Sequence, residues 1–564
     1  MSSLPAKSQA LSGPFPKYAD VGGEGFFARA RREHRAYPPR SVRCEQRSLR
    51  EKEPPNTLAH LRNGPPSPVE RRAQAIEELT RAPLDVLVVG GGIVGSGIAR
   101  DAALRGLRAG LVEQHDFAFG TSSRSSRLLH GGLRYLAQGR IGLVREASIE
   151  KRIVHHIAPH LAEPLAFIFP AYRGDPHWSL WQLKIGVKVY DLLCGGRNLG
   201  KSAWLSRDQV YERVPALSGE GLAGAVRYYD GFTNDARLTL DTLRSAAGGG
   251  AAVLNYCRFN QAARRVLWEC EVQDMLTGDK RLVQARTVVN ATGPWADGLP
   301  HSRVKLRATK GIHLVVQRER VPVPDSIVMT QGERILFAIP WGQRTILGTT
   351  DTDYSGPIED VRADASDIAY VLEVVNHFFP KARLRDSDLL SVWAGLRPLI
   401  ADPKGKPSDV SRSHQIRSPE PGWWDVAGGK LTTYRLMAEQ TVDRIVKWLG
   451  KLNKPGEPGR GNGAFGRCRT AEEPLLPPAE TAGVSGILPP EPSGCAVEHY
   501  VNREWSLHLD DVMLRRTSWH YYSAEAPKLA ERVADWMSGP LGWSAQTRAA
   551  EIDRYARATA MPRH

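Results

Sequence analysis

The stretch DVLVVGGGIVGSGIARDAALRGLRAGLVE, residues Asp85–Glu113, decides the fold class of this chain. It opens with DVLVV, an apolar, β-branched run that has the length of a strand. Gly90, Gly92 and Gly95 then form the motif G-x-G-x-x-G, and a helical pattern follows them. A second apolar run ends on Glu113, about 20 residues beyond the glycines. This order of strand, glycine turn, helix, strand and acid predicts a βαβ unit of an α/β protein.

Such a unit is suited to binding a dinucleotide. The glycines allow a tight turn and let the backbone approach a pyrophosphate at the helix N-terminus. An acid at the position of Glu113 can accept a hydrogen bond from a ribose hydroxyl. The alternative is an ordinary βαβ turn with incidental glycines, and the acid in register with the motif argues against it.

Three later segments indicate a large resident cofactor. Small hydroxyl residues and glycines follow Glu113, an apolar run at residues 287–291 ends in small residues, and a Gly-Gly-Lys turn precedes a helical pattern near residue 431. Such residues bring the backbone close to a ligand and supply donors. A serine-rich surface loop and a helix-entry loop with a solvated lysine are the alternatives. The cofactor-binding residues predicted from these segments are Gly90, Gly92, Gly95, Glu113, Thr121, Ser122, Ser126, Gly131, Gly132, Thr292, Gly293, Gly428, Gly429 and Lys430.

Eight motifs occur in an order that resembles one family. They are VVGGGIVGSGIARDAALRG, TSSRSSRLLHGGLRYL, YYDGFTNDARL, VVNATGPWAD, KGIHLVV, IPWGQRTILGTTDTDY, AGLRPL and AGGKLTTYR. The chain is similar from about Pro83 to Leu449 to the FAD-dependent, quinone-linked glycerol-3-phosphate dehydrogenases. The resemblance implies FAD as the cofactor, sn-glycerol 3-phosphate as the substrate and a membrane quinone as the electron acceptor. It also implies that the loop with Thr350 and Asp351 packs near the flavin, which adds these two as secondary cofactor-binding candidates.

The resemblance also implies a substrate site. A phosphorylated alcohol needs cations for its phosphate and a base for its hydroxyl proton, and arginine suits phosphate because its planar fork donates two parallel hydrogen bonds. His313 is the expected general base, with Lys430 as the other possibility and a buried structural histidine as the alternative. Arg134 is expected to take part in catalysis together with His313 and Lys430. The predicted substrate-binding residues are Arg134, Tyr135, Arg397, Arg412 and Lys430.

Composition limits the cellular location and the kinds of partner that we expect for this chain. No run approaches the ~18 apolar residues of a membrane-spanning helix. The six cysteines show neither the spacing of metal ligands nor a C-x-x-C motif. We therefore expect a cytoplasmic protein without a metal site. The formal net charge of +15 suits an anionic substrate and an anionic membrane surface. No nucleic-acid-binding module accompanies that charge. We therefore expect peripheral attachment at the inner membrane and a possible homodimer.

The layout predicts four parts. Residues 1–82 are proline-rich and read as a disordered extension, with a targeting peptide or a mis-assigned start codon as alternatives. Residues 83–454 are the expected oxidoreductase core: a two-dinucleotide-type, Rossmann-like FAD domain with an antiparallel-sheet substrate subdomain. Residues 455–494 read as a Pro/Gly-rich linker. Residues 495–564, with the LRRT motif at Leu514–Thr517, read as a shortened C-terminal helical cap.

The predicted function is oxidation of sn-glycerol 3-phosphate to dihydroxyacetone phosphate, with hydride transfer to FAD. A glycerol-3-phosphate oxidase and an FAD dehydrogenase of another small hydroxylated substrate are the alternatives among enzymes. A flavin-binding protein without turnover is the alternative from a different class.

Overall fold

The glycine motif forms the predicted βαβ unit. In the computed structural model, all six residues of β1 (Leu84–Val89) are buried. β1 pairs in parallel with β2 (Ala109–Val112) on one side and with β10 (Lys280–Asn290) on the other. The connecting helix, α2 (Ile93–Leu104), is buried along most of its length. The structure describes residues 66–137, 139–195, 198–332, 334–401, 414–452 and 465–560.

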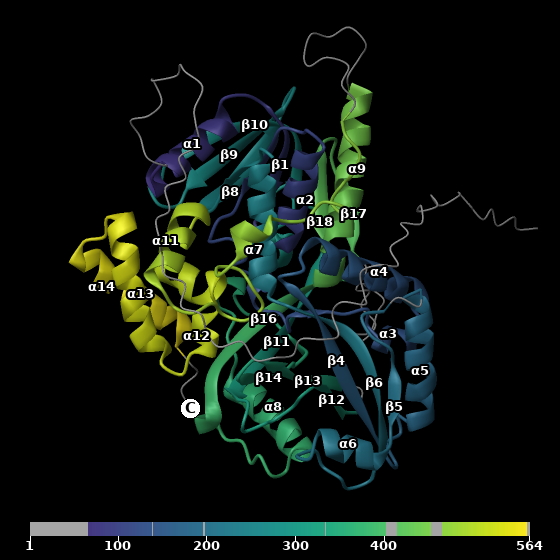
Figure 1. Ribbon diagram of the computed structural model, residues 1–564. Coiled ribbons are helices and arrows are strands. Elements are labelled where there is room, and N and C mark those ends of the chain that lie inside the picture. The colour runs from purple at the N-terminus through teal and green to yellow at the C-terminus, as the bar shows by residue number, and fades with distance from the viewer. Residues whose placement is uncertain are drawn as a thin grey trace, which may run out of the picture. The chain divides into compact units, whose positions relative to one another are not determined.

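The first sheet has eight strands in the described ranges, and its main path runs β17-β18-β10-β1-β2-β7 (Figure 1). Its other strands are β7 (Ala252–Leu254), β8 (Cys257–Arg264), β9 (Trp268–Asp274), β17 (Gln415–Arg417) and β18 (Trp423–Ala427). The pairs from β18 to β7 are parallel, whereas β17 and β9 pair antiparallel to their neighbours. The carboxyl ends of the parallel strands therefore meet at one edge, where α/β proteins bind ligands.

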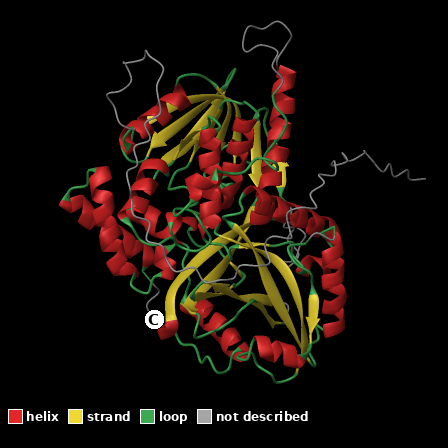
Figure 2. Ribbon diagram, in the orientation of Figure 1, coloured by secondary structure: helices red, strands yellow, loops and turns green. Residues whose placement is uncertain are grey.

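The second sheet is mostly antiparallel and has ten strands in the described ranges (Figure 2). They are β3 (Leu128–Leu129), β4 (Ala162–Tyr172), β5 (Ala203–Leu205), β6 (Leu222–Thr233), β11 (Leu306–Gln317), β12 (Ser326–Gln331), β13 (Arg334–Trp341), β14 (Arg344–Gly348), β15 (Thr352–Asp353) and β16 (Leu389–Ile400). Only the β4–β12 pair of these described strands is parallel. This sheet is the predicted substrate subdomain, and the predicted α/β fold class is confirmed.

Helices cover both sheets and form a separate C-terminal layer. α2 packs against α7 and α9, α8 packs on the second sheet, and α11 to α14 share a core of their own (Figure 1). The other helices are α1 (Pro68–Thr80), α3 (Arg134–Ala137), α4 (Ile141–Ile157), α5 (Leu180–Leu193), α6 (Arg207–Arg213), α7 (Asp235–Gly248), α8 (Ala365–Phe378), α9 (Tyr434–Leu452), α10 (Pro478–Thr481), α11 (Gly494–Arg503), α12 (Trp519–Tyr522), α13 (Ala526–Leu541) and α14 (Ala545–Thr559). Within the described ranges, no helix combines the length and apolar character needed to cross a bilayer. The predicted shortening of the C-terminal part stays a prediction.

The predicted disordered extension through residue 82 is wrong for its last part. Helix α1 begins at Pro68, where the side chain of Ser67 accepts a hydrogen bond from the Glu70 amide and the carboxylate of Glu70 accepts one from the Ser67 amide. Leu79 is buried against the first sheet, and Arg72 forms an ion pair with Asp274 at 2.9 Å. The high proline content led to a prediction of disorder, although residues 67–80 form a short helix with a capping box. Residues 1–65 lie outside the described residues.

The predicted linker at 455–494 is wrong for residues 465–494. Leu475 and Ile487 are buried. The guanidinium of Arg100, itself buried on α2, donates to the carbonyl oxygens of Thr470 and Glu473 at 3.2 and 2.7 Å. A Pro-rich segment has few amide donors, but its carbonyls can accept from a buried arginine. This segment therefore packs on the FAD domain; residues 453–464 lie outside the described residues.

Candidate active site

The turn after β1 has a shape that only glycine permits. Gly90 has φ +112°, and a Cβ there would lie 2.6 Å from the carbonyl oxygen of Ala291. A Cβ on Gly95 would lie 1.9 Å from the carbonyl oxygen of Gly90. Ser122 accepts a hydrogen bond from the Ile93 amide at 2.9 Å and so seats its loop on the N-terminus of α2. Backbone, helix end and loop thus form one narrow cradle at the sheet edge.

Glu113 stands at the end of β2 as the motif predicts. Its carboxylate accepts hydrogen bonds from the Gly91 amide at 2.8 Å and from the His115 amide at 2.9 Å. Burial raises the pKa of Glu113, although these two hydrogen bonds act in the opposite direction. The carboxylate therefore connects the glycine turn to the loop after β2. Its predicted bond to a ribose hydroxyl stays a prediction.

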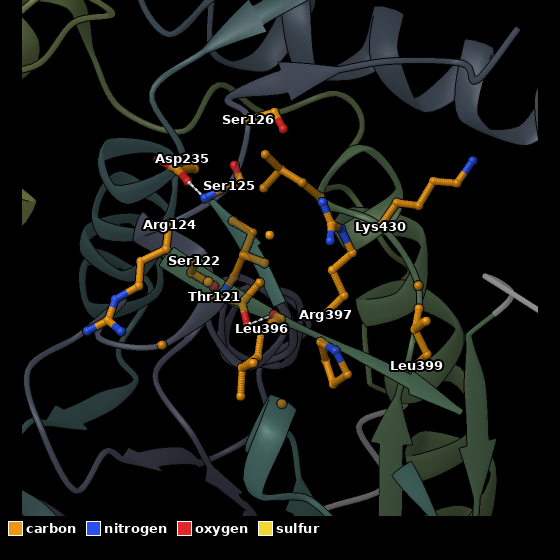
Figure 3. A pocket seen from close by; sticks show the side chains of 18 of the residues that line it. Thr121, Ser122, Arg124, Ser125, Ser126, Asp235, Leu396, Arg397, Leu399 and Lys430 are labelled. Carbon is orange, nitrogen blue, oxygen red and sulfur yellow. Dashed lines mark hydrogen bonds between the residues drawn. The ribbon is translucent and has the colours of Figure 1, made fainter. Parts of the chain in front are cut away.

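A cavity of about 1050 Å³ lies where the two sheets meet. Drug-sized ligands usually occupy cavities of roughly 300–1,000 Å³, so this one has room for a large cofactor together with a small substrate. The predicted site residues that line it are Gly90, Gly92, Glu113, Thr121, Ser122, Ser126, Gly132, Tyr135, Thr292, Gly293, His313, Thr350, Asp351, Arg397, Gly428, Gly429 and Lys430. Figure 3 shows ten lining residues by name, among them Thr121, Arg397 and Lys430.

Two predicted residues lie outside the cavity wall, and two others fall on side chains or residues that the structure does not describe. Gly95 lies beneath Gly90 instead of in the cavity wall, and Gly131 is buried against Tyr190, whose hydroxyl accepts from the Gly131 amide at 3.0 Å. For Arg134, on α3, only the backbone is described. Arg412 lies outside the described residues. Gly95 and Gly131 therefore shape the site from behind.

His313 lies on β11, buried in the cavity wall. Its Nε2 is 2.8 Å from the hydroxyl of Ser126, and its ring stacks on Trp393 with centroids 5.0 Å apart. Nδ1 has no hydrogen-bond partner among the described residues. Burial, followed by the charges of Arg397 and Arg127, lowers the pKa of His313 to about 3. The imidazole is therefore neutral at pH 7.

Arg397 approaches the cavity from β16, opposite Thr309 of β11. It donates to Asp351 at 3.2 Å and to the Thr349 hydroxyl at 3.1 Å. Thr350 is buried beside this pair and accepts from the Ile312 amide at 3.1 Å. The loop that follows β14 is therefore held against β11 and supplies an acidic partner for Arg397.

Lys430 enters from the first sheet, at the end of the loop after β18. Its ammonium lies 3.9 Å from the centre of the Tyr135 ring, a cation–π distance. Gly132 has φ +84°, and a Cβ there would lie 2.3 Å from Tyr135 and 3.3 Å from the Lys430 nitrogen. Two cations from different sheets, Arg397 and Lys430, thus reach one cavity (Figure 3).

Sequence reasoning missed two acidic residues that line the cavity. Asp235 follows Asn234, the N-cap of α7, and its carboxylate accepts a hydrogen bond from the Ser125 amide at 2.9 Å (Figure 3). Asp230 lines the cavity and is paired with the buried Lys151 at 2.8 Å. Both acids lie in YYDGFTNDARL, and that motif was the signal that could have indicated them.

The C-terminal helices contact the loop that follows Glu113. Asp116, fully buried in that loop, pairs with both Arg515 and Arg516 of the LRRT motif. Arg516 donates to Asp116 Oδ1 at 2.9 Å and to the carbonyl oxygen of Glu504 at 2.6 Å. The LRRT motif therefore anchors the C-terminal layer on the predicted cofactor loop.

Comparisons with known proteins agree with this geometry. The model of the family "FAD dependent oxidoreductase" matches residues 85–444. The aerobic glycerol-3-phosphate dehydrogenase of Bacillus subtilis (strain 168) is 38% identical over 416 residues, which cover 72% of this chain and 73% of the relative. The glycerol-3-phosphate dehydrogenase of Mycobacterium leprae (strain TN) is 34% identical over 528 residues, which cover 86% and 90%.

A solved structure extends the agreement to the fold. The glycerol-3-phosphate dehydrogenase of Bacillus halodurans, solved in complex with FAD, superposes with a TM-score of 0.66 at 28% identity, over 87% of this chain and 97% of that one. The family model and the relatives together cover the glycine turn, both sheets and the cavity between them. The chain therefore belongs to the FAD-dependent oxidoreductases and, within them, to the glycerol-3-phosphate dehydrogenase family, whose cofactor is FAD.

Proposed function

We propose that this protein oxidises sn-glycerol 3-phosphate to dihydroxyacetone phosphate and passes the electrons to a membrane quinone. One observation carries the proposal: Arg397, Lys430 and His313 come from three separate segments and line the same cavity as the dinucleotide turn. Cations, a neutral imidazole and a flavin cradle are the groups that oxidation of a phosphorylated alcohol requires. The names of the relatives support the choice of substrate.

The residues of the cradle fit FAD. The turn at Gly90 and the N-terminus of α2 would hold the pyrophosphate, since both bring backbone amides close to an anion. Thr292, Gly293 and the glycines before Lys430 would lie along the remainder of the cofactor. When bound, FAD supplies the acceptor for the hydride that leaves carbon 2 of the substrate.

Arg397 and Lys430 would bind the phosphate. Arg397 can present two parallel donors to phosphate oxygens, whereas Lys430 acts as a point charge. The carboxylate of Asp351, which Arg397 now contacts at 3.2 Å, would give way to the more highly charged phosphate. Arg134, Tyr135 and Arg412 stay predicted members of this site.

His313 would handle the proton of the substrate hydroxyl. Its neutral imidazole keeps Nδ1 without a hydrogen-bond partner among the described residues, while Nε2 is held by Ser126. A pKa of about 3 means that His313 would hold this proton briefly and pass it on. Lys430 is the other possible proton carrier. The pH dependence of flavin reduction in a His313→Gln variant tests this, since a profile like that of the wild type would assign the proton to Lys430.

The test of the overall function is anaerobic addition of sn-glycerol 3-phosphate to the purified protein while the flavin absorbance is followed. Rapid bleaching is expected. A yellow protein that does not bleach would keep the cofactor but overturn the substrate, and another small hydroxylated substrate would then be sought. Reoxidation of the bleached protein by a quinone, measured against reoxidation by oxygen, tests the acceptor. Faster reaction with oxygen would make the protein an oxidase.

A further inference from the structure

Asp230 is a buried acid on the cavity face of the second sheet. The residue is 2% exposed. Side chains two positions apart on a strand point to the same face, and Tyr228 and Asp230 of β6 both line the cavity. An acid is rarely buried this deeply unless a partner compensates its charge. The partners of its two carboxylate oxygens therefore indicate its role.

Three donors converge on one oxygen of this carboxylate. Oδ1 accepts from the Lys151 ammonium at 2.8 Å, from the Tyr190 hydroxyl at 2.5 Å and from the Gly131 amide at 3.2 Å. Lys151 and Tyr190 are fully buried and come from α4 and α5, which both contact β6 (Figure 1). None of the three donors lines the cavity. The charge of Asp230 is thus balanced from behind the cavity wall.

The second oxygen of Asp230 has no such partner. Among the described residues no group donates to Oδ2, and this oxygen stays accessible from the cavity that Asp230 lines. A carboxylate in an ion pair, as Asp230 is with Lys151, carries acceptor sites only. Asp230 therefore presents one open hydrogen-bond acceptor to a molecule that occupies this part of the cavity.

This open acceptor lies close to Lys430, one of the two cations proposed for the substrate phosphate. Gly131, whose amide donates to Oδ1, is followed by Gly132, and a Cβ on Gly132 would lie 3.3 Å from the Lys430 nitrogen. One dipeptide therefore joins the two charged groups. Consecutive Cα atoms are about 3.8 Å apart, so a three-carbon substrate whose phosphate binds Lys430 has its other end within reach of Asp230.

We propose that Asp230 Oδ2 accepts a hydrogen bond from the terminal hydroxyl of the substrate, on the carbon that neither carries the phosphate nor is oxidised. Asp230 is then a specificity-determining residue. A primary alcohol satisfies the open acceptor, a methyl group leaves it unpaired, and a carboxylate is repelled by its charge. The inference rests on the proposed function, because it takes the phosphate to bind at Arg397 and Lys430.

Asp230→Asn exchanges the acceptor for a donor and keeps the shape of the side chain. The Lys151 ammonium and the Gly131 amide can only donate, so they require the amide oxygen at the position of Oδ1. The amide NH2 group then takes the place of Oδ2 and faces the cavity. The matched control is Asp235→Asn. Asp235 is equally buried in the cavity wall, but its two oxygens already accept from the amides of Ser125 and Ala236.

The test compares the wild type and these two variants as holoenzymes without oxygen. The probes are sn-glycerol 3-phosphate, propane-1,2-diol 1-phosphate and 3-phosphoglycerate, all with the same configuration at carbon 2. Flavin reduction at low substrate concentration gives the second-order rate constants of the two alcohols, and isothermal titration calorimetry gives the affinity for 3-phosphoglycerate. We expect the wild type to react at least about tenfold faster with glycerol 3-phosphate than with the diol phosphate.

Asp230→Asn should lower that ratio at least about threefold and should bind 3-phosphoglycerate at least about tenfold more tightly than the wild type does. Asp235→Asn should change neither value by more than about twofold. Equal changes in the two variants, or no change in Asp230→Asn, would overturn the inference and leave the proposed function standing.

The wild type decides the matter even if Asp230→Asn does not fold. Equal rate constants for glycerol 3-phosphate and the diol phosphate would mean that no group in the cavity recognises the terminal hydroxyl, and Asp230 would lose the role given to it. A wild-type flavin that neither phosphate reduces would overturn the proposed function, and this inference with it.

Discussion

Replacing Arg397 by alanine should raise the KM for sn-glycerol 3-phosphate by about 100-fold and leave kcat nearly unchanged. The side chain is 23% exposed and lines the cavity, so it can present two donors to one phosphate. Hydrogen bonds to charged groups contribute about 1.5–3 kcal/mol each, and two at the lower value give about 3 kcal/mol. Every 1.4 kcal/mol is a factor of ten in affinity. The phosphate takes no part in the bond changes, so the loss should affect binding more than chemistry.

The ion pair with Asp351 supplies a control of opposite sign. Asp351→Ala removes a carboxylate that competes with the substrate phosphate for Arg397. The Asp351 side chain is 42% exposed, and an ion pair of that kind is worth about 1 kcal/mol or less. We therefore expect KM to stay the same or to fall by at most about fivefold. Arg397→Ala leaves Asp351 in contact with water, so the folded protein should lose little stability.

A second control tests whether the effect on KM comes from the position of Arg397 or from the loss of any nearby positive charge. Arg307 forms a similar ion pair with Asp353 at 2.5 Å, from the strand that pairs with β16, but Arg307 does not line the cavity. Arg307→Ala should leave KM unchanged. The assay is the steady-state rate of turnover with a quinone as acceptor at a series of substrate concentrations. An Arg397→Ala protein with a normal flavin spectrum and a KM within about twofold of the wild type would refute the reasoning.

Contacts of Gly95, Asp116 and His313 lead to three more measurements, of flavin binding, of stability and of its pH dependence. Gly95→Ala should abolish FAD retention, measured as the ratio of flavin to protein absorbance, because its Cβ would lie 1.9 Å from the Gly90 carbonyl oxygen; a flavin content equal to the wild type would contradict it. Asp116→Ala should lower the free energy of unfolding in urea by about 3–5 kcal/mol, because the buried Arg515 and Arg516 lose their shared carboxylate. A loss below about 1 kcal/mol would contradict this prediction. His313 has a pKa of about 3 in the folded protein, so between pH ~6.5 and that value only the unfolded chain binds a proton on this histidine. Each pH unit of acidification in this range should therefore lower the free energy of unfolding by about 1.4 kcal/mol through His313. In urea unfolding at pH 6 and 5, His313→Gln should lose correspondingly less stability per pH unit than the wild type.

The local part of the FAD domain was predictable from the sequence. The apolar run of β1, the turn at Gly90 and the acid at Glu113 lie within about 30 residues, so their spacing alone specifies a strand, a turn and a helix start. The order of the later motifs indicated which loops come together. It did so because the carboxyl ends of parallel strands share one edge of a sheet.

The partners of the site residues were not predictable in the same way. The carboxylate of Glu113 accepts from two backbone amides, and the register of β11 decides that His313 meets Ser126, 187 residues away. Those contacts depend on how two sheets pack. Spacing along the chain carries no information about that packing.

Composition was least informative where polar or proline-rich segments are held by buried partners. Residues 68–80 and 465–494 read as disordered extension and linker, yet Leu79 is buried on the first sheet and Arg100 binds the carbonyls of the second segment. Asp116 meets Arg516 across 400 residues. The βαβ unit, the family and the kinds of residue in the site could be predicted, because they depend on the order of residues within short stretches. Which charges are paired and which segments are covered could not, because burial depends on every element that packs around a residue.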